Sequence, residues 1–352
     1  MGALLLTGEE VGADATVDVD DEVRGGRLGG AACCQDQSAR STHSDFMQPV
    51  FALTSIAGRL SSGQMKGAPV PGTSGATAAD AGTVDIGGDI TVNRLGFGAM
   101  RITGRGIWGE PPDRNQARAV LRRAVELGIN FIDTADIYGP KVSEELIAEA
   151  LHPYPDDLVV ATKGGLVRPG AERLDPDGRP EHLRQACEGS LRLDQIPLYQ
   201  FHRPDPAVPL EDSIGALVAL KDDGKIRHIG LSNVNEDQLH RAQTLTPIVS
   251  IQNRYNPGDR SSEALVDLCV QEQMAFLPWA PVQNLDRLST LTRIAERHGA
   301  TAYQVTLAWL LARSETMLPI PGTGSVQHLE ENVAAASLRL DRQEIAALND
   351  PG

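Results

Sequence analysis

Four side chains that could take part in proton transfer lie at or just after short apolar runs in the middle of the chain. Asp133 and Tyr138 belong to FIDTADIYG, Lys163 ends VVATK, and His202 ends LYQFH. A tyrosine hydroxyl has a pKa of about 10 and is a poor acid at neutral pH, but a neighbouring ammonium group lowers that pKa. We expect Lys163 to act in this way, with Asp133 as its counterion and His202 as a donor to a carbonyl oxygen.

This combination suits the protonation of an oxygen that becomes an alkoxide when hydride reaches its carbon. No amino-acid side chain delivers hydride, so the set implies a reduced nicotinamide cofactor. Taken singly, each residue has an ordinary explanation, such as a solvated strand end for Lys163 or a capped turn for Asp133. Their convergence favours a shared catalytic role, because they follow three consecutive predicted strands.

The elements that must position these residues alternate between apolar runs and amphipathic helices from residue 83 onward. A small hairpin, TVDIGGDITV, precedes eight β-like runs that alternate with helical segments. Eight such units over about 270 residues are typical of a (β/α)8 TIM barrel. An open doubly wound sheet is disfavoured, because GFGAMR lacks the third glycine of the dinucleotide-binding fingerprint. The predicted strands are LGFGAM, NFIDTAD, LVVATKGG, LYQFH, IRHIGLS, VSIQNRY, AFLPWAP and LPIPGT.

In a TIM barrel the active site lies at the C-terminal ends of the strands. Polar or aromatic side chains also end the predicted strands five, six and seven, and the eighth run leads through a glycine-containing loop into a helix. Backbone N–H groups at the start of such a helix bind phosphate. The residues at these later positions are Ser232, Asn233, Gln252, Trp279, Gly322, Thr323 and Ser325.

The motifs FIDTADIYG, ATKGG, LYQFHR, GLSNV, SIQNRYN and PIPGTGSVQHLEENV together resemble those of the aldo-keto reductases, over residues 90 to 350. The resemblance implies a barrel without a Rossmann domain that uses NADPH, with NADH possible, to reduce an aldehyde or ketone. It implies Tyr138 as the general acid, Lys163 and Asp133 as the groups that tune it, and His202 as the residue that orients the carbonyl. The implied cofactor-binding residues are Ser232, Asn233 and Gln252 at the nicotinamide carboxamide, Trp279 on the ring, and Gly322, Thr323, Ser325, His328 and Asn332 beyond it.

One departure from the family pattern concerns the 2′-phosphate of NADPH. Many members carry a lysine and an arginine where this chain has Gly322 and His328. Here the phosphate would rely on Thr323, Ser325, His328 and backbone N–H groups, so we expect a moderate preference for NADPH. The wording of NRLGFGAMRITG and GIWGEPPDR is nearest to bacterial pyridoxal-reductase-like members, which suggests pyridoxal or another small aldehyde as the substrate.

Composition and charge argue against several other classes of function. The chain of 352 residues has a formal charge of -15 and no block of Lys and Arg, which argues against nucleic acid or an anionic membrane as a partner. No apolar run approaches the roughly 20 residues needed to span a bilayer. The four cysteines fit neither a zinc spacing nor a disulfide framework, and no HExxH occurs. We therefore expect no metal and a cytoplasmic protein.

Residues 1–82 differ from the rest of the chain. They contain 13 glycines, two aromatic residues and runs such as GAPVPGTSGATAADAG. Such a stretch buries too little apolar surface to offset the entropy lost on ordering it. We expect a disordered extension over residues 1–82, followed by the barrel over residues 83–352.

Two other functions are compatible with the same residues. The barrel could serve as a cofactor-sensing regulatory subunit of a larger assembly, since such a subunit can retain the four polar residues. Alternatively, Lys163 could form a Schiff base in a lyase or isomerase. The second alternative leaves Trp279 and the predicted carboxamide-binding residues without a role.

Overall fold

The computed structural model describes residues 75–171, 173–282 and 289–349, all within the compact unit Pro69–Gly352. Residues 1–74 of the predicted extension lie outside the described residues. A 3-10 helix, η1 (Ala78–Ala81), lies just before the predicted boundary at residue 82. Ala78 is fully buried and its N–H donates to the carbonyl of Leu127 at 2.9 Å. The described fold therefore includes residues that the sequence assigned to the extension.

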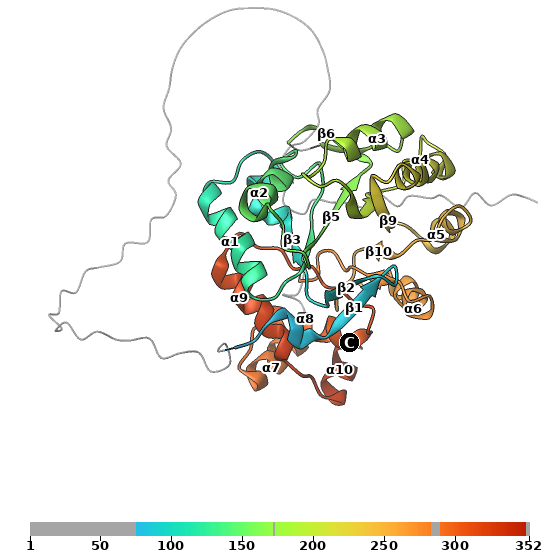
Figure 1. Cartoon of the computed structure of the whole chain (residues 1–352). Helices are drawn as coiled ribbons and strands as arrows, with labels where there is room; N and C mark the ends of the chain where they lie inside the picture. Colours follow the sequence, from blue (N-terminus) through green and yellow to red (C-terminus); the bar gives the residue numbers. More distant parts are fainter. Residues whose placement is uncertain (1–74, 172, 283–288, 350–352) are drawn as a thin grey trace, which may run out of the picture. The chain divides into compact units, whose positions relative to one another are not determined.

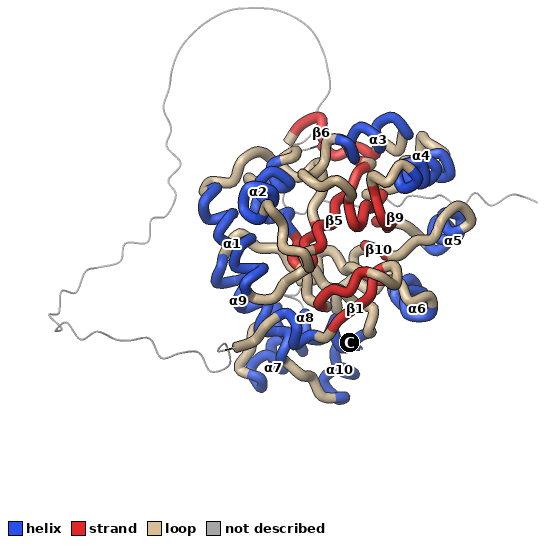
Figure 2. The backbone as a smooth tube through the Cα atoms, in the orientation of Figure 1, coloured by secondary structure: helices blue, strands red, loops and turns tan. Residues whose placement is uncertain are grey.

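A curled parallel sheet forms the centre of this unit, and helices surround it (Figures 1 and 2). The strand order is β11-β10-β9-β8-β5-β4-β3, so each strand pairs with its neighbour along the barrel wall. The strands are β3 (Phe97–Gly98), β4 (Phe131–Asp133), β5 (Val159–Gly164), β8 (Ile196–Phe201), β9 (Ile226–Ser232), β10 (Ser250–Gln252) and β11 (Ala275–Phe276). The helices are α1 (Arg114–Glu126), α2 (Val142–Leu151), α3 (Pro180–Glu188), α4 (Leu210–Asp222), α5 (Glu236–Gln243), α6 (Glu263–Gln271), α7 (Ser289–His298), α8 (Ala302–Arg313), α9 (Val326–Ala334) and α10 (Arg342–Asn349).

The eighth predicted strand, LPIPGT, closes the barrel without forming a regular strand. The N–H groups of Gly96 and Gly98 donate to the carbonyls of Pro319 and Pro321 at 3.0 and 3.4 Å. On its other side, the N–H of Leu318 donates to the last residue of β11 at 2.8 Å. The two prolines have no N–H to return the bonds to β3, so no continuous ladder forms there. The TIM-barrel prediction is confirmed, with an eighth strand reduced to separate hydrogen bonds.

The predicted hairpin covers one end of the barrel interior. Strands β1 (Thr83–Ile86) and β2 (Ile90–Asn93) pair antiparallel, as predicted, and the turn glycines Gly87 and Gly88 both have positive φ. The buried side chains of the hairpin pack against inward-facing residues of β4, β5 and β8. This end is apolar, so the polar residues gather at the opposite, C-terminal ends of the strands. The buried hairpin residues are Val84, Ile86, Ile90 and Val92.

Side-chain caps mark the starts of α1, α5, α8 and α10. Asp113 accepts from two backbone N–H groups at the start of α1, and three reciprocal pairs of the capping-box type occur elsewhere. These local contacts fix where helices begin, independently of the barrel. The reciprocal pairs are Asn235 with Gln238, Thr301 with Gln304, and Asp341 with Glu344.

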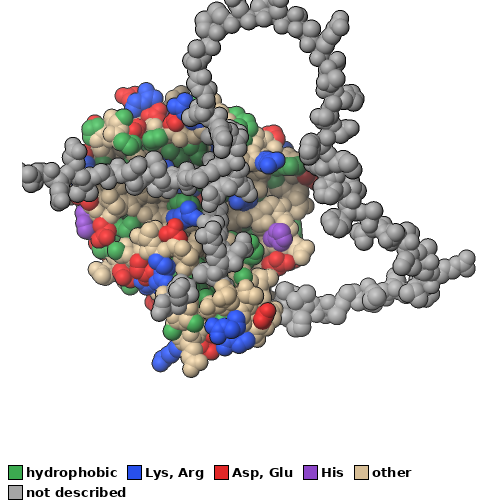
Figure 3. Space-filling view, turned by 180° about the vertical axis from the view of Figure 1, so that it is seen from behind, with side chains coloured by type: hydrophobic (Ala, Val, Ile, Leu, Met, Phe, Trp, Pro, Cys, Tyr) green, Lys and Arg blue, Asp and Glu red, His purple; other side chains and the backbone are tan. Residues whose placement is uncertain are grey.

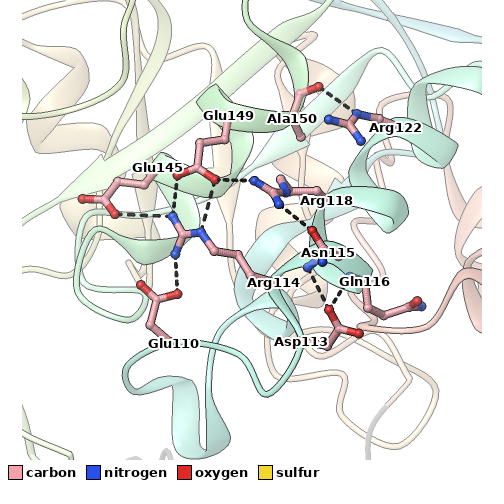
Figure 4. Close-up of polar contacts among 10 residues, drawn as sticks. All are labelled: Glu110, Asp113, Arg114, Asn115, Gln116, Arg118, Arg122, Glu145, Glu149 and Ala150. Carbon is pink, nitrogen blue, oxygen red and sulfur yellow. Dashed lines mark hydrogen bonds and ion pairs between the residues drawn. The ribbon is translucent and has the colours of Figure 1, made fainter.

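An arginine–glutamate network joins α1 to α2 at the surface (Figure 4). Arg114 contacts Glu110, Glu145 and Glu149, and Arg118 also pairs with Glu149 at 3.1 Å. Exposed ion pairs each contribute about 1 kcal/mol or less to stability. Because Glu110 belongs to the loop that precedes α1, the network also holds that loop, which borders the site described below.

The described surface mixes side chains of both charge signs with apolar ones (Figure 3). Large exposed apolar side chains occur singly, including Trp108 and Tyr303. Among the described residues, no helix is long and apolar enough to cross a membrane.

Candidate active site

A buried ion pair lies at the C-terminal ends of β4 and β5. Nζ of Lys163 is 2.6 Å from Oδ2 of Asp133 and donates to the carbonyl of Thr134 at 2.9 Å. Lys163 and Asp133 are 1% and 2% exposed. Burial alone would lower the pKa of Lys163, but Asp133 and Tyr138 outweigh it and raise the pKa. Lys163 is therefore cationic at neutral pH.

Tyr138 lies against this pair. Its hydroxyl oxygen is 3.4 Å from Nζ of Lys163, and its ring meets the imidazole of His202 edge to face, with centroids 6.2 Å apart. Burial raises the pKa of Tyr138, and the opposing effect of Lys163 is smaller. Lys163 does act to lower this pKa, as expected, but desolvation acts more strongly and the net pKa is raised. The phenol stays protonated at neutral pH and can donate its proton.

His202 is held as a neutral imidazole. Burial lowers its pKa well below the usual range, and the positive charges of Lys163 and Arg203 add to the effect. Its Nδ1 has no hydrogen-bond partner among the described residues. A neutral imidazole can donate from one nitrogen, so His202 is able to hydrogen-bond a carbonyl oxygen. The four predicted catalytic residues thus lie together.

Two buried amides complete the coordination of Asp133. Nε2 of Gln200 and Nε2 of Gln252 donate to Oδ1 of Asp133 at 2.9 and 2.8 Å, and Gln252 also donates to Oε1 of Gln200 at 3.2 Å. Sequence reasoning missed Gln200. A signal was present, since Gln200 stands two residues before His202 and so faces the same side of β8.

Three of the predicted cofactor-binding residues lie beside His202. Asn233 donates to the carbonyl of His202 at 3.0 Å and to the hydroxyl of Ser232 at 3.1 Å. The indole Nε1 of Trp279 donates to Oδ1 of Asn233 at 3.1 Å. Asn233 has a φ of 57°, a conformation that asparagine adopts more easily than most residues. These bonds fix the indole of Trp279, which is partly buried, next to the catalytic group.

The loop before α9 contains the remaining predicted residues. The hydroxyl of Ser325 caps α9 by accepting the N–H of His328 at 3.4 Å, and the N–H of Ser325 donates to the hydroxyl of Thr323 at 3.1 Å. His328 is exposed and Asn332 is partly buried. They lie four residues apart on one face of α9. The structure brings these residues together as a second group, on a different element from the catalytic four.

Gly322 has a structural reason to be a glycine. A β-carbon at this position would lie 2.4 Å from the carbonyl oxygen of Gly98, closer than side-chain atoms approach backbone. The same hypothetical atom would lie 3.7 Å from Cγ of Arg101, so the Arg101 side chain runs beside the loop. Arg101 is exposed, and no hydrogen bond or ion pair joins it to another described residue. Sequence reasoning missed this cation, although it directly follows GFGAM.

An apolar cluster surrounds Tyr138. Part of it comes from a hairpin that sequence reasoning missed, β6 (Leu166–Gly170) with β7 (Arg173–Pro176). Arg168 of this hairpin donates to the carbonyl of Gly106 and lies over the ring of Trp108 at 5.6 Å. These contacts join the hairpin to the loop before α1. The cluster contains Ala135, Ile137, Tyr138 and Leu166, with Met100, Ile107 and Leu174 packed against them.

Within the described residues, no group of His, Cys, Asp and Glu is arranged to hold a metal ion. Cys187 and Cys269 are buried free thiols.

Comparison with known proteins gives concordant matches. The sequence model of the Aldo/keto reductase family matches residues 94–350. The chain is 47% identical to an uncharacterized oxidoreductase of Schizosaccharomyces pombe, over 80% of this chain and 93% of the relative. It is 42% identical to pyridoxine 4-dehydrogenase of Escherichia coli, over 74% of this chain and 96% of that enzyme.

Solved structures match the fold. A thermostable aldo-keto reductase in complex with the inhibitor epalrestat is 30% identical with a TM-score of 0.68, over 77% of this chain and 99% of that one. An aldo/keto reductase of Klebsiella pneumoniae in complex with NADP and acetate is 27% identical with a TM-score of 0.65, over 76% of this chain and 94% of that one.

Proposed function

Because this chain belongs to the aldo/keto reductase family, and is therefore an NAD(P)H-dependent oxidoreductase, we propose that it reduces a small aldehyde to an alcohol with NADPH and with Tyr138 as the proton donor. The observation that carries the proposal is the contact of Lys163 with both Asp133 and Tyr138 in one buried group. A cation held beside a protonated phenol stabilises the phenolate that remains after proton transfer.

Each residue of the group has a distinct task in this proposal. His202, kept neutral, donates to the substrate oxygen and orients it toward the Tyr138 hydroxyl. Tyr138 transfers its proton to that oxygen, and Lys163 compensates the charge left on the phenol. Asp133 keeps Lys163 in place. When bound, the reduced nicotinamide supplies the hydride.

Several features fit a nicotinamide cofactor. The side-chain amide of Gln252 donates to Asp133 and Gln200, and no described residue donates to its Oε1, which can accept from a carboxamide. Ser232, Asn233 and the indole of Trp279 lie beside the same end of the barrel. The capped start of α9 offers backbone N–H groups to phosphate.

We propose that Arg101 supplies the positive charge at the 2′-phosphate, in place of the lysine and arginine that many family members carry. Its side chain runs beside the Gly322 loop and has no carboxylate partner among the described residues. Together with Thr323, Ser325 and the exposed His328, it would hold the 2′-phosphate and favour NADPH over NADH. Asn332 would contact the cofactor further along α9.

For the substrate we propose pyridoxal or a similar aromatic aldehyde. The similar Escherichia coli protein is named pyridoxine 4-dehydrogenase, and the apolar cluster around Tyr138 suits the flat face of an aromatic ring. We place the reaction in the cytoplasm, in keeping with the free thiols of Cys187 and Cys269.

The Schiff-base alternative is disfavoured by the state of Lys163. A nucleophilic lysine needs a lowered pKa, whereas Asp133 and Tyr138 raise that of Lys163. A regulatory subunit differs from an enzyme in turnover, which the following experiment measures.

The test is NADPH oxidation with pyridoxal, aromatic aldehydes and aliphatic aldehydes, for the parent and for Tyr138→Phe. Removing a general acid lowers the rate by roughly 10²–10⁴-fold, while NADPH binding, followed by fluorescence, should stay nearly unchanged. Tyr303→Phe is the matched control, because Tyr303 is an exposed residue of α8. Activity of Tyr138→Phe within about tenfold of the parent would sink the assignment. A parent that binds NADPH without turning over any aldehyde would favour the regulatory subunit.

A further inference from the structure

We propose that Gln200 is a positioning residue that couples Gln252, at the nicotinamide carboxamide, to the general acid Tyr138 through Asp133 and Lys163. The inference rests on the proposed function of the same site. It concerns a residue outside the catalytic and cofactor-binding residues that the family resemblance implies.

Gln200 links both partners of the site by hydrogen bonds. Its Nε2 donates to Oδ1 of Asp133 at 2.9 Å, and its Oε1 accepts from Nε2 of Gln252 at 3.2 Å. Oδ2 of Asp133 contacts Lys163 at 2.6 Å, and Lys163 reaches the hydroxyl of Tyr138 at 3.4 Å. A continuous chain of polar contacts therefore runs from Gln252 to the phenol.

The neighbouring strands of the barrel position the side-chain amide of Gln200. Gln200 pairs with Lys163 of β5 on one side and with Gly230 of β9 on the other. A β-carbon at Gly230 would lie 3.0 Å from Cγ of Gln200 and 2.2 Å from the hydroxyl of Ser250. A side chain at Gly230 would therefore crowd the base of the Gln200 side chain.

Gln200 is fully buried, where an amide is unfavourable unless its groups are paired. The residue below it on the same face of β8 is the apolar Leu198, so an apolar side chain is compatible with this wall. An amide at this position is explained by the two bonds it makes, since packing alone does not require one.

The hydrogen bonds from Gln200 and Gln252 orient the carboxylate of Asp133. Asp133 accepts from Lys163 on one oxygen and from two amides on the other, which fixes the plane of the carboxylate. A carboxamide that donates to the carbonyl of Gln252 polarises that amide and strengthens its donation to Asp133 and Gln200. Cofactor binding thereby holds the plane of Asp133 more firmly, and hence the position of Lys163 beside the phenol.

The experiment compares three full-length variants in steady-state reduction of the best aldehyde of the panel. Gln200→Met keeps the length but removes both hydrogen bonds, and kcat/KM should fall about tenfold or more. Leu198→Met, on the same strand and face, is the matched control and should stay within about twofold, because volume-conserving core changes are well tolerated. Thermal unfolding of each variant reports whether the barrel is intact.

Gln200→Glu separates positioning from packing. A protonated carboxyl can donate to Asp133 and accept from Gln252, so activity should be near that of the parent at mildly acidic pH. As pH rises and the introduced carboxyl ionises beside Asp133, it loses its proton and repels the carboxylate, and activity should fall. A pH profile parallel to that of the parent would overturn the proposal.

A double-mutant cycle on NADPH affinity tests the coupling without any substrate. Gln200→Met, Gln252→Met and the double variant are compared by fluorescence titration. If Gln200 orients Gln252, Gln252→Met should weaken NADPH binding much less in the Gln200→Met background than in the parent. Additive losses would overturn the coupling even where the parent reduces aldehydes, whereas a parent without turnover contradicts the proposed function instead.

Discussion

Asp133→Asn should destabilise the folded chain strongly, because it leaves the cation of Lys163 buried without a counterion. Lys163 is 1% exposed and would keep only a backbone carbonyl and the phenol as partners. Removing one partner of a buried ion pair costs about 3–5 kcal/mol. For a domain of this size, about 2–4 °C per kcal/mol gives a fall in Tm of roughly 6–20 °C.

The pH dependence of this loss follows from the pKa of Lys163, which the fold raises above its ordinary value of 10.5. A raised lysine pKa stabilises the fold at all pH values below 10.5, and this stabilisation disappears only as pH rises through the folded pKa. The contribution of the pair to the stability of the parent should therefore be constant across neutral pH.

Thermal unfolding followed by circular dichroism measures the effect, with urea unfolding as a second method. The informative comparison is Asp133→Asn with and without Lys163→Met. Removing the unpaired cation should recover part of the lost stability, since apolar replacements of buried ion pairs are often tolerated. A Tm for Asp133→Asn within about 3 °C of the parent, or a double variant less stable than Asp133→Asn alone, would refute the reasoning.

Three other outcomes follow from the structure. Because burial raises the pKa of Tyr138 above 10.0, kcat/KM for reduction should not decline with rising pH until pH exceeds that value, and a decline near neutrality would contradict this. Ile107 has a φ of 59°, so Ile107→Gly should be more stable than Ile107→Ala by about 1 kcal/mol in urea unfolding; equal stabilities would mean that the backbone is not strained there. Deleting residues 1–82 should lower Tm relative to deleting residues 1–74, because only the longer deletion removes the buried Ala78 and its bond to Leu127; identical Tm values would show that η1 does not stabilise the barrel.

Features set by short-range chemistry could be predicted from the sequence. Asp113 and Asn235 cap helices through bonds to residues two or three positions away, so their role is visible in a few letters. Asp133, Lys163 and His202 could be placed together because each ends or directly follows a predicted strand, and the active site of a TIM barrel lies at those strand ends. The catalytic group followed from these positions once the barrel was inferred.

Features that depend on burial or on distant strands could not be predicted in the same way. The pKa of Tyr138 is raised by desolvation, which is set by the packed cluster around it and not by its sequence neighbours. The bonds of Gln200 arise because barrel closure brings β4, β8 and β10 together at one end. The hairpin β6–β7 escaped notice because its strands carry charges and prolines that are unfavourable in strands.

The alternating prolines of LPIPGT did carry information that was overlooked. Pro319 and Pro321 cannot donate to a ladder, and this alone indicates a strand that accepts hydrogen bonds without returning them. The helical turn just before residue 82 could not be predicted from composition. Ala78 stands in a stretch of small residues whose composition suggests disorder, yet a single buried alanine is sufficient to anchor one turn.

Closure of the barrel by residues near the C-terminal end has a consequence for how the chain is made. During synthesis, β3 and β11 remain as free edges of an open sheet until the segment around Leu318 leaves the ribosome, since that segment pairs with both. Unpaired strand edges are templates for association with other chains. The nascent protein is therefore most exposed to aggregation just before its last helices emerge, and released chains truncated before Thr316 should bind chaperones more strongly than the full-length chain.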